Sequence, residues 1–323
     1  MEAIQQQGYG DPRQVLREVQ QPVPTITDDQ VLVRTHASSA NPADWHLVCG
    51  EPLLMRPALG GLRAPSRIIG TDFAGVVEQV GGSVTHLSAG DEVYGYAEGA
   101  FAEYVAAPGA STARKPTTCT FTEAAAVPLA GITALQGLRL GNLEAGQHVL
   151  ILGASGGVGT FAVQLATHLG AEVTGVCSTS RLDLVRRLGA DHVIDYTAQN
   201  PATGSARYDV ILQLGGTYSA RSLRRRLTPR GTLVQSMGDG GRWLGPLGAM
   251  AGAAALNLVV RQRLVPLVAK ETTAALDDLR ELIDAGHVRP VIDSEYPLAR
   301  AAEALSLVKD GRPAGKVVLT VAA

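Results

Sequence analysis

The sequence is short of cysteine, of net charge and of long basic runs, and each shortage excludes a class of protein. Its three cysteines, Cys49, Cys119 and Cys177, are odd in number and lie far apart. This pattern argues against a disulfide framework and favours a reducing compartment, so we expect a cytoplasmic protein. The formal net charge is −2, which gives no reason to expect nucleic acid or an anionic membrane as a partner.

Length and composition indicate a folded protein of two domains. Hydrophobic residues make up 46% of the chain and charged residues 18%, which argues against disorder. At 323 residues the chain is long for one core and short for three. The residues Met1–Gly8 contain no basic region followed by an apolar core, so we expect no signal peptide. The adjacent Arg224, Arg225 and Arg226 would fan around a helix, which predicts a solvated face.

One apolar run, His148–Leu152, breaks directly into a turn of small residues, Gly153-Ala-Ser-Gly-Gly-Val-Gly159, and then into an amphipathic helix. Residues 172–177 supply a second strand at the distance that a βαβ unit requires. Backbone N–H groups in such a turn can approach a pyrophosphate, and the positive end of the helix favours its charge. We therefore predict a dinucleotide-binding unit, although Ala154 replaces the first glycine of the fingerprint G-x-G-x-x-G. The alternative is a glycine-rich turn that binds no ligand.

The end of the second strand indicates which dinucleotide binds. An NAD-binding unit places an Asp or Glu about 20 residues after the turn, where it accepts from the ribose 2′-hydroxyl. This chain has Cys177-Ser-Thr-Ser-Arg181 there, with no carboxylate to repel a phosphate. Ser178 can donate a hydrogen bond and Arg181 a charge-assisted one to a 2′-phosphate, so we favour NADP(H). Alternatively, Ser178–Ser180 only cap the helix at 182–188 and Arg181 is solvated.

Strand and helix patterns alternate from about residue 128 to residue 290, as in a doubly wound parallel sheet. The further elements expected there are strands at 192–195, 208–214 and 232–236, a turn at 229–231, and helices at 182–188, 219–227 and 273–285. The first 125 residues instead hold short runs between Gly, Pro and Asp turns, which predict a mainly antiparallel β domain. Residues 315–321 form another strand with no crossover helix after it, so we expect this strand to return to the first domain.

Six motifs occur in a specific order and spacing, and together they span nearly the whole chain. They are Asn41-Pro-Ala-Asp44, Gly70-Thr-Asp-Phe-Ala-Gly-Val-Val77, Gly90-Asp-Glu-Val93, Gly99-Ala-Phe-Ala-Glu-Tyr104, Ala126-Val-Pro-Leu-Ala-Gly-Ile-Thr-Ala134 and Ala154-Ser-Gly-Gly-Val-Gly159. In them the chain resembles the medium-chain dehydrogenase/reductase superfamily, in its zinc-independent quinone-oxidoreductase and enoyl-reductase branch. The resemblance implies an α/β protein that is often a homodimer through its Rossmann sheets. A GroES-like, mainly antiparallel β domain is expected at residues 1–127, completed by about 291–323, and a Rossmann domain with a doubly wound parallel sheet at 128–290.

The positions that match the zinc ligands of zinc-dependent relatives predict a protein without a metal site. Those relatives use Cys, His and Cys where this chain has Asn41, Thr71 and Leu129, and none of these is a good zinc ligand. The structural lobe with four cysteines is excluded because the chain has only three. Without a Lewis acid, the chain lacks the usual means of ionising an alcohol for oxidation.

We therefore expect hydride transfer from NADPH to an already electrophilic π-system. The expected substrate is a quinone or the C=C bond of an α,β-unsaturated carbonyl compound, and donors near the carbonyl oxygen would stabilise the charge that develops there. Two alternatives stay open. One is NADPH-dependent reduction of a ketone or aldehyde, and the other is a non-catalytic NADPH-binding sensor or scaffold.

Asn41 and His46 are the candidate catalytic residues. Relatives carry Asn at the position of Asn41, near the nicotinamide ribose and the substrate, where its amide can donate; alternatively it only caps the turn before Pro42. Enoyl-thioester reductases have a proton-donating Tyr where this chain has Glu51-Pro52. His46 is the best local substitute, because an imidazole can give up a proton near neutral pH, and water is the alternative donor. Asp72 could orient groups in the cleft, but we expect it mainly to form a turn.

The resemblance also implies a set of cofactor-binding residues. Thr133 is expected near the nicotinamide side, the glycine turn at the pyrophosphate and the end of the second strand at the 2′-phosphate. Gln213 stands where relatives often have Asp. The full set is Thr133, Gly153, Ala154, Ser155, Gly156, Gly157, Val158, Ser178, Arg181, Tyr196, Leu214, Gly215, Ser236, Met237 and Lys316.

One segment, residues 243–260, could be mistaken for a membrane span. From Trp243 to Val260 there is no charged residue, and this length would allow a span. Many glycines and alanines make the stretch less apolar than an isolated span needs to be. We therefore predict no membrane span but a helix that is buried at an interface or lies over the active-site cleft.

Overall fold

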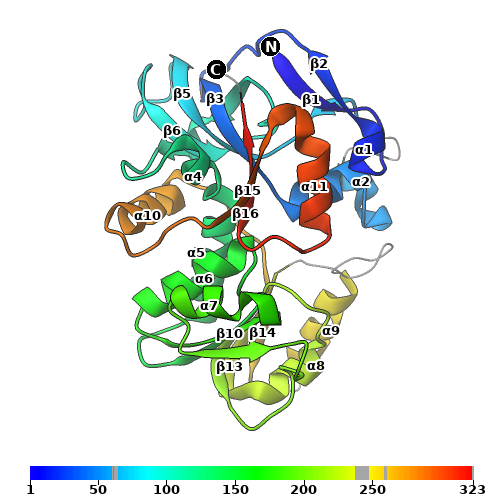
Figure 1. Ribbon diagram of the computed structural model, residues 1–323, viewed down its shortest axis with the longest axis vertical. Coiled ribbons are helices and arrows are strands. Elements are labelled where there is room, and N and C mark those ends of the chain that lie inside the picture. The colour runs from blue at the N-terminus through cyan, green and yellow to red at the C-terminus, as the bar shows by residue number, and fades with distance from the viewer. Residues whose placement is uncertain (60, 62–64, 237–246, 258–259, 322–323) are drawn as a thin grey trace. The chain divides into compact units, whose positions relative to one another are not determined.

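The computed structural model describes residues 1–59, 61, 65–236, 247–257 and 260–321 (Figure 1). The chain divides into two compact units, of which the first contains residues 1–132 and 271–323 and the second residues 133–270. Helix α5 (Pro128–Gly141) contributes residues to both units. Both ends of the chain therefore belong to the first unit, as the N and C labels in Figure 1 indicate.

The first unit is built on a seven-stranded sheet with the order β15-β16-β3-β5-β6-β8, in which β7 also pairs with β3. Every pair is antiparallel except β15–β16. The strands are β3 (Gln30–Ala40), β5 (Asp72–Val80), β6 (Glu92–Tyr96), β7 (Tyr104–Pro108), β8 (Thr112–Arg114), β15 (Ile292–Pro297) and β16 (Lys316–Thr320). Buried side chains such as Val33, Phe73 and Val93 form a core against this sheet. The predicted mainly antiparallel β domain is confirmed.

The C-terminal strand returns to this sheet, as predicted. β16 pairs antiparallel with β3, with Val317 opposite Ala40 and Thr320 opposite Ala37. A smaller sheet with the order β2-β1-β4 completes the strands of the unit: β1 (Glu2–Gln6), β2 (Leu16–Gln20) and β4 (Arg67–Ile68). Its helices, besides the start of α5, are α1 (Pro12–Val15), α2 (Pro42–Cys49), α3 (Arg56–Leu59), α4 (Phe121–Ala125), α10 (Thr273–Asp284) and α11 (Ala301–Lys309).

Helix α10 belongs to the first unit, which differs from the predicted boundary at residue 290. Its buried face, Ala275, Leu276, Leu279 and Ile283, has the helical spacing that predicted a helix at 273–285. The Leu276 carbonyl accepts a 2.6 Å hydrogen bond from the buried Tyr94 hydroxyl of β6. Thr273 Oγ1 donates to the carbonyl of Gly109 at 3.0 Å. These contacts hold α10 to the antiparallel sheet, so the division falls at residue 270.

The second unit contains a six-stranded parallel sheet with the order β11-β10-β9-β12-β13-β14. This is the doubly wound order 3-2-1-4-5-6 of dinucleotide-binding domains. The strands are β9 (His148–Leu152), β10 (Glu172–Cys177), β11 (His192–Asp195), β12 (Tyr208–Gln213), β13 (Leu227–Ser236) and β14 (Arg263–Leu267). The expected turn at 229–231 lies within β13, where the pairing with β12 shifts register between Tyr208 and Val210. Strand β14 was not predicted.

The helices of the second unit, besides the end of α5, are α6 (Gly157–His168), α7 (Leu182–Arg187), α8 (Ala220–Leu223) and α9 (Leu247–Asn257). Helix α9 covers part of the segment 243–260, of which residues 243–246 and 258–259 lie outside the described residues. Figure 1 shows α9 beside α8, and the Asn257 side chain exchanges two hydrogen bonds with the backbone of Leu264 in β14. Over the part of the chain that the structure describes, we find no helix with both the length and the apolar character of a membrane span.

Candidate cofactor and active sites

The glycine turn of the second unit follows β9 and leads into α6, as the sequence predicts. Gly153 has φ +82°, a left-handed conformation that favours glycine. The N–H groups of Gly153 and Ala154 donate to the Val176 carbonyl of β10 at 3.2 and 2.9 Å. A Cβ on Gly159 would lie 2.1 Å from the Gly153 carbonyl oxygen, so only glycine allows the first turn of α6 to lie this close to the loop.

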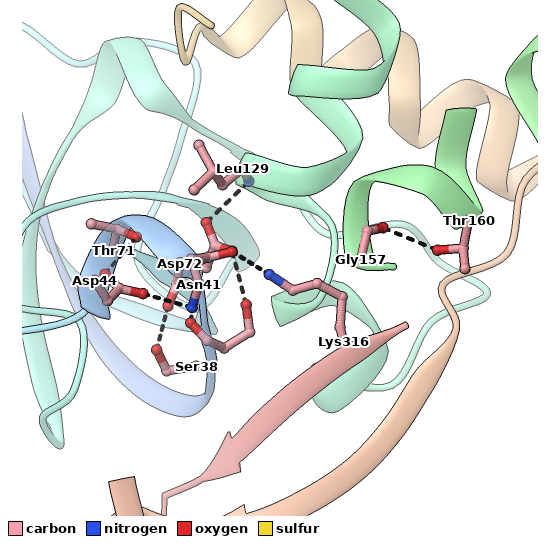
Figure 2. Close-up of polar contacts among 10 residues, drawn as sticks. Ser38, Asn41, Asp44, Thr71, Asp72, Leu129, Gly157, Thr160 and Lys316 are labelled. Atoms are coloured by element: carbon pink, nitrogen blue, oxygen red, sulfur yellow. Dashed lines mark hydrogen bonds and ion pairs between the residues drawn. The ribbon is translucent and has the colours of Figure 1, made fainter. Parts of the chain in front are cut away.

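The turn presents backbone donors that have no acceptor within the described chain. Gly156 stands before the first residue of α6 and has no side chain to cap it. The N–H of Thr160 donates to the Gly156 carbonyl at 3.0 Å, but no acceptor in the described residues meets the N–H groups of Gly157 and Val158. Thr160 Oγ1 donates to the Gly157 carbonyl rather than reaching the turn (Figure 2). Free N–H groups at the positive end of a twelve-residue helix fit a pyrophosphate.

The next strand end along the sheet lies against this turn. The N–H of Leu214 donates to the Leu152 carbonyl at 3.0 Å. A Cβ on Gly153 would meet the backbone of Gly215 at 3.2 Å, so the two glycines let the strand ends approach closely. Gln213, which replaces the Asp of many relatives, donates to the Gly216 and Tyr218 carbonyls and accepts from Gln235. The structure therefore brings Leu214 and Gly215 to the glycine turn and uses Gln213 to fix the loop after β12.

Three of the predicted 2′-phosphate residues lie at the ends of β10 and β11. Ser178 precedes a 3₁₀ turn, Thr179–Arg181, whose last residue is Arg181, and the Arg181 N–H donates to the Ser178 carbonyl at 2.9 Å. Ser178 makes no side-chain capping bond, and its hydroxyl lies 3.5 Å from that of Ser180. The Tyr196 N–H donates to the Cys177 carbonyl at 3.1 Å, which places this half-exposed tyrosine beside the same loop.

A carboxylate does stand close to this loop, contrary to the expectation from the sequence. Asp195, at the end of β11, is opposite Cys177 in the parallel register. It accepts from Thr179 Oγ1 at 2.5 Å and from the N–H and hydroxyl of Thr197 at 2.8 and 2.7 Å. These hydrogen bonds, that from Thr179 above all, lower the pKa of Asp195. The proximity of Asp195 to this loop could not be predicted from the sequence, because Asp195 belongs to a different strand from the one that leads to Ser178 and Arg181.

The remaining predicted cofactor residues divide between the two units. Thr133 is buried at the first position of the second unit, and Ser236 is the last residue of β13. Met237 lies outside the described residues. Lys316 begins β16 in the first unit and is 3% exposed.

Lys316 joins a buried polar cluster in the first unit, the Asp72 cluster, which we define as Asn41, Asp44, Thr71, Asp72 and Lys316 (Figure 2). Lys316 Nζ donates to Asn41 Oδ1 at 2.5 Å and to Asp72 Oδ2 at 3.3 Å. Asp72 is 0% exposed, so its charge and that of Lys316 are both removed from water. Such a pair is retained only where further hydrogen bonds satisfy its remaining polar atoms.

Asp72 receives those further hydrogen bonds from three other segments. Its Oδ2 accepts from Ser39 Oγ at 2.8 Å and from Asn41 Nδ2 at 3.0 Å, and its Oδ1 accepts from the Leu129 N–H at 3.0 Å. Asp72 therefore orients the amide of Asn41. From the sequence we expected Asp72 mainly to form a turn, with the orientation of other groups as its less important role. The residue lies within β5.

Both amide hydrogens of Asn41 have acceptors in the protein. Nδ2 donates to Asp72 Oδ2 at 3.0 Å and to the Ser39 carbonyl at 3.3 Å, while Oδ1 accepts from Lys316. The Asn41 N–H donates to Asp44 Oδ2 at 2.9 Å, which begins α2. The residue thus holds the turn before Pro42, and its longer bond to Ser39 is the one that it can exchange for another acceptor.

Asp44 has a strongly shifted titration. Burial, followed by the like charge of Asp72, raises its pKa to about 7. Its other oxygen, Oδ1, accepts from Thr71 Oγ1 at 3.2 Å. Protonation of Asp44 leaves Asp72 and Lys316 as a neutral pair, so the net charge of the cluster changes near neutral pH.

His46 lies on α2, half-buried and next to Trp45, with 4.9 Å between the ring centroids. Its Nδ1 is buried and has no hydrogen-bond partner within the described part of the chain. No hydrogen bond between described residues links its ring to the Asp72 cluster. The structure therefore brings Asn41 and Lys316 together but does not join His46 to them.

Comparison with known proteins finds two family descriptions, one that matches part of the first unit and one whose match spans the boundary at residue 270. Residues 27–117 match the alcohol dehydrogenase GroES-like domain, and residues 188–319 match the family described as zinc-binding dehydrogenase. The residues present do not fit zinc. Asn41, Thr71 and Leu129, at the positions that match its ligands, all hydrogen-bond to Asp44 or Asp72, and the Lys316 ammonium already supplies a cation to Asp72 Oδ2. Among the described residues, no group of three His, Cys, Asp or Glu side chains could hold a metal ion.

Three proteins illustrate the similarity of the whole chain. The chloroplast envelope quinone oxidoreductase homolog of Arabidopsis thaliana is 33% identical over 99% of this chain and 98% of its own length. The chloroplastic NADPH-dependent alkenal/one oxidoreductase of the same plant is 33% identical over 92% of this chain and 73% of its own. The crystal structure of Escherichia coli quinone oxidoreductase complexed with NADPH has a TM-score of 0.84 and 26% identity, and it covers 99% of this chain and 100% of that one.

Proposed function

Since this chain belongs to the medium-chain dehydrogenase/reductase superfamily, in its zinc-independent quinone-oxidoreductase branch, we propose that it is an NADPH-dependent reductase of quinones or of the C=C bond of α,β-unsaturated carbonyl compounds. The observation that carries this proposal is the Asp72 cluster. The positions that match zinc ligands hold an amide, a hydroxyl and an alkyl side chain, and the amide accepts a hydrogen bond from the buried Lys316 ammonium. Such a site suits substrates that accept hydride without activation by a metal.

The second unit supplies the groups that bind the cofactor. The N–H groups of Gly157 and Val158 hold the pyrophosphate, and Ser178, Arg181 and Tyr196 hold the 2′-phosphate. Asp195 accepts hydrogen bonds from Thr179 and Thr197 at both of its oxygens, so protein donors take the place of the ribose 2′-hydroxyl that the carboxylate of an NAD-binding unit would accept from. When bound, NADPH supplies the hydride.

The first unit supplies the electrostatic stabilisation. Reduction of an enone or quinone places negative charge on the carbonyl oxygen of the substrate. The Lys316 ammonium has three N–H groups, of which two meet Asn41 and Asp72 in the described structure, so the third can donate to that oxygen. Asn41 donates to the developing oxyanion by exchanging its 3.3 Å bond to the Ser39 carbonyl. Asp72 acts through both residues and is therefore a positioning residue.

The proton that completes the reduction comes from His46 in this proposal. The support is its place on α2, the helix that Asn41 begins, and the buried Nδ1 without a partner among described residues. His46→Phe keeps a flat ring and removes the proton. It should lower kcat without changing the Kd of NADPH, with a loss of about 100-fold or more, as is usual when a general acid is removed.

The direct test is oxidation of NADPH in the presence of a panel of quinones, enones, enoyl thioesters and ketones. Turnover of quinones or enones supports the proposal, whereas turnover of ketones alone contradicts it. Lys316→Met should lower kcat by on the order of 100-fold, as for other groups that stabilise developing charge, with NADPH still bound. Binding of NADPH without turnover of any member of the panel would identify a binding protein instead.

The choice of NADPH over NADH has its own test. Arg181→Ala should raise the Kd of NADPH by about tenfold, because a charge-assisted hydrogen bond contributes roughly 1.4 kcal/mol or more. The Kd of NADH should stay within about twofold, since NADH lacks the 2′-phosphate. Arg186→Ala, a nearby exposed arginine that pairs with Asp183, is the matched control. Equal changes for both cofactors would overturn the assignment of Arg181.

We also propose a cytoplasmic homodimer. Strand β14 is an edge of the six-stranded sheet with no further strand paired to it among the described residues, and such an edge can accept a partner strand. The three cysteines are all free thiols, as expected in a reducing compartment. Light scattering after size exclusion tests the dimer, and cell fractionation tests the compartment.

A further inference from the structure

The arginine run at 224–226 does not form the uniformly solvated face that its sequence predicts. Arg226 is only 4% exposed, and its guanidinium donates to the carbonyls of Pro201, Thr203 and Ala206 and to the Tyr208 hydroxyl. Arg224 is half-buried and Arg225 is exposed. The run forms a 3₁₀ turn after α8, so its three side chains have three different environments.

A groove of about 490 Å³ lies beside this turn and is lined by four arginines. It is formed where β12, β13 and β14 begin, because its residues come just before β12 and β14 and at the start of β13. Its polar lining consists of Arg207, Arg224, Arg225, Arg261, Gln262 and Thr228. We call this concavity the arginine groove.

The arginines of the groove lack acidic partners. No carboxylate of the described residues lies within ion-pair distance of any of the four. Arg224 Nη1 donates only weakly, to Gln262 Oε1 at 3.4 Å, and Arg224 Nε is buried without an acceptor in the described structure. The nearest acid by hydrogen bonding is Asp209, whose oxygens accept from Thr228 Oγ1 and the His148 N–H. Arg207 Nη1 donates to the carbonyls of Ser205 and Ala206, which are neutral. Four guanidiniums without a carboxylate partner among the described residues repel each other around one concavity, and an anion would relieve that repulsion.

We propose that the arginine groove binds a ligand that carries two or more phosphate groups. Guanidinium forks match phosphate oxygens with paired hydrogen bonds, so several arginines around a small concavity favour phosphate over a single carboxylate. The buried Arg224 Nε supplies a donor that the protein leaves without an acceptor among the described residues. The volume of the groove lies in the range of small-molecule sites, about 300 to 1,000 Å³.

This site is separate from the proposed cofactor site. In a parallel sheet the N-terminal ends of all strands lie on one side, and the glycine turn follows the C-terminal end of β9 on the opposite side. Strand β12 has six residues, so roughly 20 Å of strand separates its N-terminal end from its C-terminal end. A phosphate in the groove therefore cannot share ligands with the cofactor, and the proposal does not depend on the proposed function.

The test is calorimetric titration of the full chain with inorganic pyrophosphate at low salt, alone and with NADPH present. We expect saturable binding in both cases that weakens as salt is added. Arg225→Gln together with Arg261→Gln should weaken the binding roughly 100-fold, about tenfold for each charge-assisted contact. The matched control is Arg13→Gln with Arg17→Gln, which removes two exposed arginines from the first unit.

A parallel titration with vesicles distinguishes the source of the phosphate. Phosphatidylcholine vesicles that contain a phosphatidylinositol bisphosphate, whose headgroup carries several phosphates, are compared with pure phosphatidylcholine vesicles. Binding of the former that depends on Arg225 and Arg261 supports the proposal with a lipid headgroup as ligand. The proposal is overturned if neither probe binds, if NADPH abolishes the binding of pyrophosphate, or if the groove variant and the control variant bind equally.

Discussion

In the first unit the candidate site is made of buried side chains, whereas in the second unit it is made of backbone N–H groups in a turn. Asp72 is surrounded by donors from four segments and is balanced by a single ammonium, that of Lys316. The turn at Gly153–Gly157 carries no charged side chain, and its approach to the first turn of α6 depends on the absence of a side chain at Gly159. We therefore expect the Asp72 cluster to be sensitive to the removal of a polar atom, and the glycine turn to be sensitive to the addition of a side-chain atom.

The Asp72 cluster and the glycine turn differ in which kind of mutation destabilises them. Removal of an atom from the Asp72 cluster leaves a buried polar group unpaired, which costs more than the original bond contributed. Addition of an atom to the turn displaces a backbone group that no rotamer change can move. The first site should therefore respond most to deletion and to pH, and the second to bulk.

The largest effect is expected for Asp72→Ala. This change leaves Lys316 and the Leu129 N–H buried without their acceptor, so the free energy of unfolding should fall by about 3 to 5 kcal/mol. Urea denaturation measures it. Asp72→Ala combined with Lys316→Met removes both charges, and this double variant should be more stable than Asp72→Ala alone. A double variant that loses the sum of both single losses would show that the two charges do not compensate each other.

The next effect is a dependence of stability on pH. Burial and the charge of Asp72 raise the pKa of Asp44 to about 7, above its value in the unfolded chain. As pH rises from about 4 to about 7, the unfolded chain releases this proton while the folded chain keeps it, so the free energy of unfolding falls, by up to about 4 kcal/mol. Asp44→Asn should reduce this loss, as measured by urea denaturation at stepped pH. Asp28→Asn, at an exposed position of the same unit, is the control and should leave the pH dependence unchanged.

A smaller effect on stability is expected for Gly159→Ala in the second unit. The added Cβ would lie 2.1 Å from the Gly153 carbonyl oxygen, so the turn must shift, at a cost of about 1 to 3 kcal/mol. The Kd of NADPH should rise with it, by about tenfold for each 1.4 kcal/mol lost in binding. Gly252→Ala in α9 adds the same atom with nothing within 4 Å and should not lower stability. Unchanged binding of NADPH by Gly159→Ala would show that the turn does not hold the pyrophosphate.

The turn could be predicted from the sequence because its causes are local. The apolar run, the small residues and the helix pattern follow each other within residues 148–169, and each has its own spacing rule. The Asp72 cluster could be predicted only in part. Asn41 and Lys316 are 275 positions apart, and only the return of the C-terminal strand to the first unit hinted at their contact.

Two errors have the same origin, which is that a pattern describes an element but not its neighbours. Helix α10 was predicted as a helix, but its apolar face does not say which sheet it packs against. Strand β14 was missed because it is short and contains Pro266, which argues against a central strand. It lies at the edge of its sheet, where a missing N–H is tolerated.

Helix α5 constrains how new proteins can be assembled from this one. The first turn of the helix contains Leu129, whose N–H donates to Asp72, and the helix continues to Gly137 and Gly141, which pack against Leu212 and Val210 of β12. The boundary at residue 132 thus falls inside a helix. A chimera that takes its second unit from a relative should be spliced before Pro128 and at residue 270, so that the whole helix travels with the parallel sheet. Its residue at position 129 must then still offer an N–H to Asp72, which excludes proline there.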